Sequence, residues 1–383
     1  MIFSKMFERK TKVTYGKMDM PFLMVVLVLV TVGLIMMFSA SYANAYYLKN
    51  NSTFYISRQL VAAAIGVLAM TIASKMDYRI FRIFAFPMYI LTIILLIVAL
   101  FMPALNGAKR WIFIGPINFQ PSEIAKFTVV ILFATLICRY FQRMQNFLIG
   151  FVLFVVLLAP ILGLMIAEPH LSGTIIIVLL GAVMMFIGGT HIALFGFGFV
   201  AVIGAVTLVM SNPDLMDLFT AYAGTRIEVW QDPTTDPQGK GFQTLQSLYA
   251  IASGGIMGTG IGNSRQKYLY LPEPYNDFIF AVICEEMGFV GAVLIICLFI
   301  LLIWRGFVIA TRCPDKFGSL VAAGLTSQVA LQTILNIAVV TNTVPNTGIS
   351  LPFFSYGGTS LAMLMGEMGI ILSISRVVSI EKT

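Results

Sequence analysis

The chain has 383 residues, of which 59% are hydrophobic and only 11% are charged. A soluble domain of this length could not cover so much apolar surface, so the composition excludes a water-soluble globular protein and indicates a polytopic membrane protein. The net charge of +7 comes from basic residues at the ends of apolar segments. Because they form no stripe interleaved with aromatic residues, no nucleic acid is expected as a partner.

The first apolar segment covers residues 21–40 and follows a basic stretch, residues 1–20. Ala43-Asn44-Ala45 imitates a signal-peptidase site. However, an apolar run of roughly 20 residues is longer than the hydrophobic region of a signal peptide. We therefore expect a first transmembrane helix and no cleavage.

Further apolar segments along the chain are each long enough to cross roughly 30 Å of hydrocarbon. Together they predict about ten transmembrane helices, at residues 21–40, 54–74, 84–102, 122–140, 147–167, 171–187, 192–210, 277–304, 317–340 and 356–374. The expected fold class is therefore an all-α polytopic membrane protein.

The basic residues are concentrated in alternate loops, on the same side as the N-terminus. The positive-inside rule then places both termini in the cytoplasm. The expected organisation is a cytoplasmic N-terminus of residues 1–20, one transmembrane domain of residues 21–378, and a cytoplasmic tail of residues 379–383.

A long polar interval, residues 211–276, is expected outside the membrane between the seventh and eighth helices. Within it, FQTLQSLYAIA suggests a short amphipathic helix, and the GGIMGTGIG that follows suggests a loop folded tightly by glycine. The glycine run does not indicate dinucleotide binding, because that fingerprint needs a preceding strand and a βαβ unit.

A second irregular stretch, residues 341–358, separates the last two predicted helices. Its prolines and glycines forbid a regular helix although its apolar content is high. Irregular backbone at membrane depth is tolerated only where it is buried in protein or lines a wet cavity. We therefore expect a re-entrant-like outer loop, about residues 341–356, to form one wall of an outward-facing cavity.

A third stretch, GAKRWIFIGPINFQPSEIAKF, places Glu123 and Lys126 on one face at the start of a helix. Two interpretations stay open and are compatible: the two charges neutralise one another, or they face a cavity within the bundle. Basic residues are also predicted at the outer face, against the orientation rule. An anionic ligand such as a lipid pyrophosphate would explain them, and so would headgroup contact in general; they are Arg58, Lys109, Arg110, Arg226, Arg265 and Lys267.

Asp277 lies where the long polar interval meets an apolar helix, and we expect it in the first turn of that helix. An acid there either serves only the helix dipole or has a catalytic role. At 100° per residue, Glu286 is about 180° and Glu285 about 80° away from it around the helix. A two-carboxylate glycosidase arrangement on this helix is therefore not expected.

Other polar positions carry weaker signals. The four cysteines show no CxxC pair or metal spacing, so they are interpreted as core residues. Glu168, His170 and Glu367 fall within or beside apolar segments, and the sequence assigns them no role.

Three motifs in order carry a family resemblance: QPSEIAK at 120–126, YLPEPYNDFIFAVICEEMG ending at Gly288, and PNTGISLPFFSYGGTSL at 345–361. Together they resemble the SEDS family, whose members are FtsW, RodA and SpoVE. The segment around Arg226 is more similar to the FtsW and SpoVE branch than to RodA. The chain departs from the family pattern at EPHLSGT, residues 168–174, and at Glu367.

The resemblance implies about ten transmembrane helices with a large extracellular loop between helices 7 and 8. It also implies a peptidoglycan glycosyltransferase that polymerises lipid II, by inversion, at the outer face of the bacterial cytoplasmic membrane. A class B penicillin-binding protein is the implied transpeptidase partner, alongside other division or elongation proteins. No organic cofactor is implied.

On this resemblance Asp277 matches the family's essential acid, either as a base or as the ligand of a divalent cation, Mg²⁺ or Mn²⁺. The expected substrate-binding residues are Arg58, Lys109, Arg110, Glu123, Lys126, Arg226, Lys267 and Ser355. Two other functions stay open, a lipid II flippase and a scaffold for a transpeptidase, since intramembrane charges and helix breaks also occur in transporters.

Overall fold

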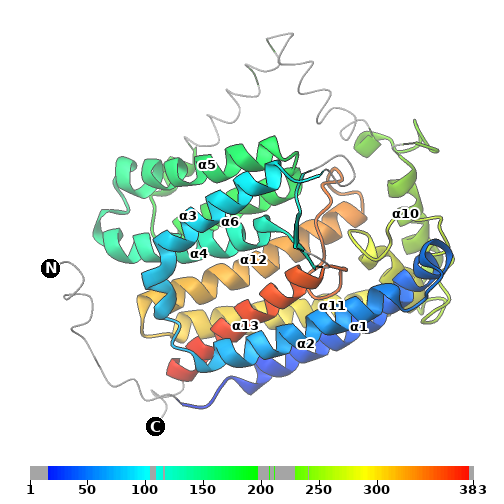
Figure 1. Ribbon diagram of the computed structural model, residues 1–383, viewed down its shortest axis with the longest axis horizontal. Coiled ribbons are helices and arrows are strands. Elements are labelled where there is room, and N and C mark those ends of the chain that lie inside the picture. Colours follow the sequence, from blue (N-terminus) through cyan, green and yellow to red (C-terminus); the bar gives the residue numbers. More distant parts are fainter. Residues whose placement is uncertain are drawn as a thin grey trace.

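The computed structural model describes residues 16–103, 109–114, 117–196, 207, 211, 229–239 and 241–378. Within these residues, eight helices are long and apolar enough to cross a membrane. They form one bundle (Figure 1), which confirms the predicted all-α polytopic fold. The elements in chain order are α1 (Met20–Lys49), α2 (Phe54–Lys75), α3 (Ile80–Leu100), β1 (Ile112–Ile114), β2 (Ile117–Phe119), α4 (Pro121–Tyr140), a 3-10 turn (Phe141–Arg143), a π-helical turn (Leu148–Val152), α5 (Leu153–Ala167), α6 (Leu171–Ile187), α10 (Phe242–Gly254), α11 (Ile279–Arg312), α12 (Lys316–Val340) and α13 (Gly358–Val378).

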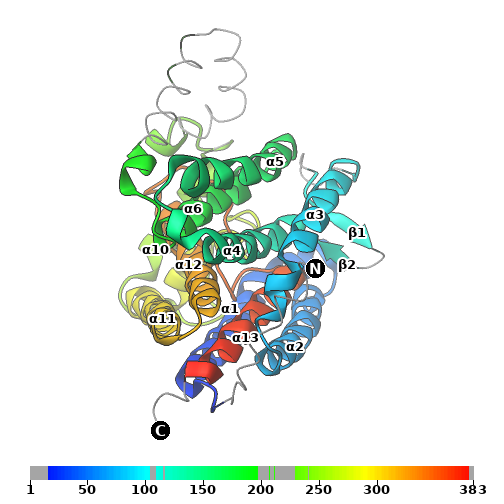
Figure 2. The ribbon, with the colours of Figure 1, turned by 90° about the vertical axis from the view of Figure 1, so that its left-hand side faces the viewer.

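Helices α4, α12 and α13 are the most buried of the long helices. Seen along the bundle, α4 and α12 lie in the middle, with α5 and α6 on one side and α1, α2 and α11 on the other (Figure 2). Helix α13 packs against α2, and α11 packs against both α12 and α1. Because the central helices are surrounded by protein, they can carry buried polar groups that lipid-facing helices could not.

One end of the bundle gathers charged residues that join segments far apart in the chain. Asp19 caps the start of α1 by accepting from the amide of Phe22, and it also binds Arg305 at 2.8 Å. The amide of Gly16 donates to the carbonyl of Arg376, so the two described ends of the chain lie side by side. The two described ends of the chain therefore lie at the same end of the bundle.

The opposite end holds the irregular segments. The antiparallel β1–β2 hairpin, the loop that follows α12 and the loop that precedes α11 all lie at this end, as does α10 (Figure 1). Helix α10, Phe242–Gly254, confirms the amphipathic helix predicted within the long polar interval. The glycine loop after it is tight as predicted, with positive φ at Gly258, Gly260 and Gly262.

Several predicted boundaries were wrong. Helix α1 continues to Lys49, well beyond residue 40, because the chain after that point stays largely apolar until Asn50 ends the helix with φ of 51°. Helix α11 starts at Ile279 and extends to Arg312, with non-helical φ and ψ at Gly288. The last helix starts at Gly358. Most of the predicted seventh helix, residues 192–210, lies outside the described residues.

Candidate active site

A cavity of about 1030 Å³ opens among the irregular segments at this end of the bundle. Its walls come from α2, the hairpin, the starts of α4 and α6, the loop ahead of α11, α12, the loop after α12 and the start of α13. The loop after α12, residues 341–357, lines the cavity through Gly348, Ile349, Ser350, Tyr356 and Gly357, as its sequence predicted. The sequence candidates in the walls are Arg58, Arg110, Glu123, Lys126 and Asp277.

Asp277 lines the cavity from a turn two residues ahead of α11, so its predicted position inside the first helical turn was wrong. The reason is tertiary: the side-chain amide of Asn336 on α12 donates to the carbonyl of Asp277 at 2.8 Å and to that of Ile349 at 2.6 Å. These bonds hold the turn against α12 and the loop that follows it.

The carboxylate of Asp277 is partly buried and has no hydrogen bond within the described part of the chain. Gly348, with φ of 74°, passes so close that a Cβ there would lie 3.1 Å from Oδ2. Burial raises the pKa of Asp277 to about 6, Glu273 adds to the rise, and Arg110 opposes it. The group is therefore mostly ionised at neutral pH, yet close enough to titration to accept a proton.

Glu123 and Lys126 stand in the first turns of α4, which Pro121 opens at a position that needs no amide donor. Lys126 Nζ lies 2.9 Å from Glu123 Oε1. Both side chains are largely buried and both line the cavity. The two sequence interpretations therefore hold together: the charges pair, and they face the cavity.

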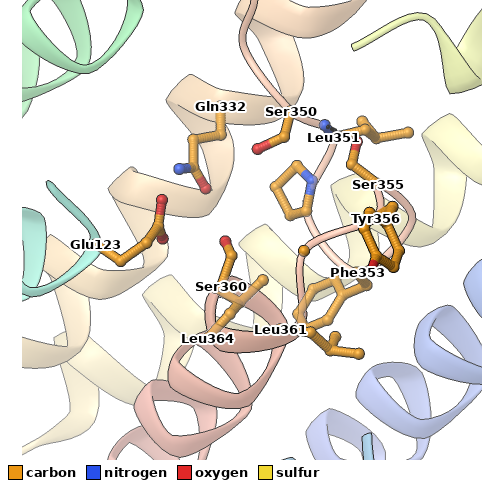
Figure 3. A pocket seen from close by; sticks show the side chains of 12 residues that line it. Glu123, Gln332, Ser350, Leu351, Phe353, Ser355, Tyr356, Ser360, Leu361 and Leu364 are labelled. Atoms are coloured by element: carbon orange, nitrogen blue, oxygen red, sulfur yellow. Dashed lines mark hydrogen bonds between the residues drawn. The ribbon is translucent and has the colours of Figure 1, made fainter. Parts of the chain in front are cut away.

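A small pocket of about 20 Å³ adjoins Glu123 and is large enough for a single water. Figure 3 shows Glu123, Gln332, Ser350 and Ser360 around it.

Arg58 on α2 and Arg110, two residues ahead of β1, add positive charge to the cavity walls. The Arg58 guanidinium stacks 4.2 Å from the centroid of the Phe54 ring and lies near the Tyr356 hydroxyl. Arg110 donates to the carbonyl of Pro169 at 2.7 Å. With Lys126, these residues bring three cations to a cavity that also holds Asp277.

A tyrosine cluster, Tyr55, Tyr275 and Tyr356, lines the cavity beside Asp277 and was missed by sequence reasoning. The Tyr275 hydroxyl donates to that of Tyr55 at 3.1 Å, and the ring centroids are 4.5 to 5.9 Å apart. Burial raises the pKa of Tyr275 above its ordinary value. Its position two residues before Asp277 was the only available signal, since the other two tyrosines come from distant helices and loops.

Other candidates lie elsewhere. Lys109 is exposed and is not among the cavity-lining residues. Lys267 is buried against Glu286 and is also absent from them. Ser355 lines only the small pocket, where its Oγ donates to the carbonyl of Asn276 at 2.8 Å. Arg226 lies outside the described residues.

The three polar positions without a predicted role also differ in place. His170 lines the cavity, and burial lowers its pKa to about 3. Glu168 is buried outside the cavity lining, and burial raises its pKa to about 8 against the opposing charge of Arg110. Glu367, on α13, accepts from Gln328 Nε2 at 2.9 Å.

Two carboxylates, those of Asp277 and Glu273, face the cavity near one another. In the described part of the chain, no group of three or more His, Cys, Asp and Glu side chains is arranged to hold a metal ion. Mg²⁺ is commonly held by one or two carboxylates together with substrate phosphates. The residues present therefore fit a divalent cation whose ligands would be these carboxylates together with oxygens of a bound diphosphate.

Comparison with protein families gives a match over residues 19–380 to the FtsW, RodA and SpoVE model, described as cell cycle protein. Stage V sporulation protein E of Bacillus subtilis (strain 168) is 40% identical over 363 residues, which cover 94% of this chain and 97% of that protein. The probable peptidoglycan glycosyltransferase FtsW of Geobacter sp. (strain M18) is 35% identical over 362 residues, which cover 93% of this chain and 96% of that protein.

Two solved structures share the fold. One chain comes from a peptidoglycan synthase complex whose description concerns the coordination of polymerization and crosslinking; it has a TM-score of 0.76 and 28% identity, with 94% of this chain and 98% of that chain covered. The crystal structure of the rod shape determining protein RodA of Thermus thermophilus has a TM-score of 0.65 and 25% identity, with 94% and 97% covered.

Proposed function

This chain belongs to the FtsW, RodA and SpoVE family of cell cycle proteins, and from that premise we propose that it is a peptidoglycan glycosyltransferase with its reaction centre in the cavity at Asp277. The substrate is lipid II, which the enzyme polymerises into glycan strands. The observation that carries this assignment is the carboxylate of Asp277, without a hydrogen bond in the described structure, in a cavity that also presents Arg58, Arg110 and Lys126.

The chemistry of glycan extension needs a base. The acceptor sugar hydroxyl loses its proton to Asp277 while its oxygen attacks the anomeric carbon of the donor, with inversion. The bond between that carbon and the diphosphate oxygen breaks, and the lipid diphosphate leaves with the electron pair. With a pKa of about 6, Asp277 can accept this proton at neutral pH and return it to solvent before the next cycle.

The departing diphosphate needs positive charge, and no acid has to protonate a sugar leaving group. Arg58, Arg110 and Lys126 supply fixed cations in a partly desolvated cavity, where such groups stabilise developing charge more strongly than in water. A guanidinium can hold two phosphate oxygens at once, whereas Lys126 acts as a point charge. Glu123 fixes the position of that ammonium through their 2.9 Å contact.

A divalent cation, when bound by Asp277 and Glu273, would neutralise part of the diphosphate charge. In that case the same two carboxylates would orient the donor, and the cations of the cavity wall would hold the remaining phosphate oxygens.

The protein works in the bacterial cytoplasmic membrane with both termini in the cytoplasm, so the cavity faces outward. This orientation follows from the basic loops, which share one end of the bundle with the termini. A class B penicillin-binding protein is the proposed partner, because the peptidoglycan synthase complex that this fold resembles is described as coordinating polymerization with crosslinking.

The test uses the purified chain with a class B penicillin-binding protein in detergent, where no bilayer exists for a flippase to act across. Synthetic lipid II is supplied and glycan strands are separated by gel. The wild type is expected to make strands, and Asp277→Asn to lose at least about 100-fold in rate while remaining folded. A folded and active Asp277→Asn variant would refute the assignment, and strand synthesis indifferent to every cavity substitution would indicate a scaffold.

A further inference from the structure

The loop between α10 and Asp277 enters a break in helix α11. Gly288 has φ of 66° and ψ of −167°, so α11 consists of a short first part, residues 279–287, and a long second part. In an unbroken helix, the amides that follow Gly288 would donate to the carbonyls of Glu285 and Glu286. Residues 255–271, here called the wedge loop, take over these bonds.

Four backbone hydrogen bonds between α11 and the wedge loop replace the missing helical ones. The carbonyls of Glu285 and Glu286 accept from amides of the wedge loop, and the amides of α11 beyond the break donate to wedge-loop carbonyls. The pairs are Thr259 N to Glu285 O (2.9 Å), Gly260 N to Glu286 O (3.0 Å), Phe289 N to Gly255 O (2.9 Å) and Val290 N to Ile256 O (3.2 Å). The break therefore leaves none of these four groups unsatisfied, as a helix inside a membrane requires.

Glycine is needed on both sides of this contact. Gly258 has φ of 80° and Gly288 has φ of 66°, a region that other residues rarely adopt. A Cβ on Gly258 would collide with the backbone of Glu286, and one on Gly288 would collide with the backbone of the wedge loop. The two backbones thus approach more closely than side chains would permit.

Buried side chains fasten the wedge loop to α11 and α1. The Glu286 carboxylate accepts from Lys267 Nζ at 2.9 Å and from Ser39 Oγ at 2.7 Å. The Glu285 carboxylate accepts from Ser264 Oγ at 2.5 Å and from the amide of Arg265 at 2.8 Å. We call Ser39, Ser264, Lys267, Glu285 and Glu286 the clamp; each of them is at most 7% exposed.

In the sequence, Asp277 lies between the wedge loop and the first part of α11, which the clamp joins. Lys267 and the fully buried Leu271 precede it, and Glu285 and Glu286 follow it on the short first part of α11. A helix of so few residues is marginal by itself and depends on packing for its position. The clamp fixes the C-terminal end of this short helix to the wedge loop. The Asp277 turn is therefore held on both sides along the chain.

We infer that the clamp and the wedge loop position Asp277 for its reaction, with Glu285, Glu286 and Lys267 as positioning residues that do not touch the substrate. This inference rests on the proposed function, which gives Asp277 a reaction to serve. No clamp residue is among those that line the cavity. A misplacement of about 1 Å at a reacting group can cost about 100-fold in rate, so the effect should be measurable.

The test is the double substitution Lys267→Met with Glu286→Gln, made in the full chain and assayed with its partner and lipid II. Removing both charges leaves neither member of this ion pair buried without its partner, so folding is preserved better than in either single variant. We expect kcat to fall by at least about 10-fold with KM for lipid II changed less than about threefold.

The pH profile gives a readout that a merely structural role would not move. Two charged groups act on the Asp277 carboxylate, Glu273 on its own loop and Arg110 just ahead of β1, and neither is altered. Loosening the turn admits water, which relieves the burial that raises the pKa of Asp277. The acidic limb of the activity profile should therefore move to lower pH in the double variant.

The matched control is Asp19→Asn with Arg305→Met, which removes another ion pair between the α1 end and α11, at the opposite end of the bundle. It should retain the wild-type kcat and acidic limb. A folded clamp double variant with the wild-type kcat and acidic limb overturns the inference. If that variant does not fold, Ser39→Ala, which removes only a hydroxyl, is measured by the same two criteria and decides in its place.

Asp277→Asn is assayed in parallel, so that two failures can be told apart. An active Asp277→Asn overturns the proposed function. An active wild type with an inactive Asp277→Asn and unaffected clamp variants overturns only the positioning role.

Discussion

Two buried ion pairs, Glu123–Lys126 and Lys267–Glu286, have the same nitrogen to oxygen distance of 2.9 Å but different surroundings. The first lines the cavity, so an anion can reach its ammonium. In the second, Lys267 also donates to Ser39 and to the carbonyl of Gly262, so every donor is occupied. The contrast shows that a lysine at this end of the bundle can bind substrate only when its ammonium group remains accessible from the cavity.

Replacing only one residue of the enclosed pair Lys267–Glu286 should have the largest effect on stability. Lys267→Met leaves the Glu286 carboxylate buried without its counter-ion, which costs about 3 to 5 kcal/mol. Thermal unfolding in detergent should show a clearly lowered midpoint. Adding Glu286→Gln should restore most of the loss, and a single variant as stable as the wild type would contradict the enclosed geometry.

Breaking the cavity pair should act on the reaction instead. Glu123→Gln with Lys126→Met removes a cation from the proposed diphosphate site while leaving no charge unpaired. Loss of such an electrostatic group costs about 100- to 1000-fold in kcat. The assay is strand formation from lipid II, with the unfolding midpoint as a control. An unchanged rate in a folded protein would mean that Glu123 and Lys126 only neutralise one another and do not act on the diphosphate.

Arg58→Met tests the cavity wall at a site with more solvent. The Arg58 side chain stacks on Phe54 and lies near Tyr356, so part of its charge is already engaged. A lost charge-assisted hydrogen bond to phosphate corresponds to about a 10-fold lower kcat/KM. Arg58→Lys should recover part of this loss, and equal activity of all three proteins would exclude Arg58 from the site.

Arg305→Met should have the smallest effect. Its pair with Asp19 at 2.8 Å is partly exposed, so its removal should cost at most about 1 kcal/mol. Strand formation should be unchanged, because the pair lies at the end of the bundle away from the cavity. A large loss of activity would contradict this account, because it would show that the Asp19–Arg305 pair affects the reaction at Asp277.

Much of this organisation could be predicted from the sequence. Apolar segments long enough to span a membrane gave most of the helices, and proline and glycine marked the loop after α12 as a cavity wall. Asp277, Glu123 and Lys126 were recognisable because ionisable residues beside or within membrane segments usually face the protein interior.

What could not be predicted depends on contacts between distant segments. The enclosure of Lys267 by Glu286 could not be predicted, because it requires the wedge loop to enter the break at Gly288. Residues 279–287 also read as the start of one continuous apolar helix. The tyrosine cluster combines side chains from α2 and two loops, and only the folded chain brings them together.

The most direct test of Asp277 as the base is the pH dependence of strand formation at limiting lipid II. A base must be unprotonated, and burial raises the pKa of Asp277 to about 6. The wild-type rate should be level above pH 7 and reach half its maximum near pH 6. Below that point it should fall about tenfold per pH unit. A rate that stays constant from pH 7.5 to about pH 5 in a folded protein would contradict Asp277 as the proton acceptor.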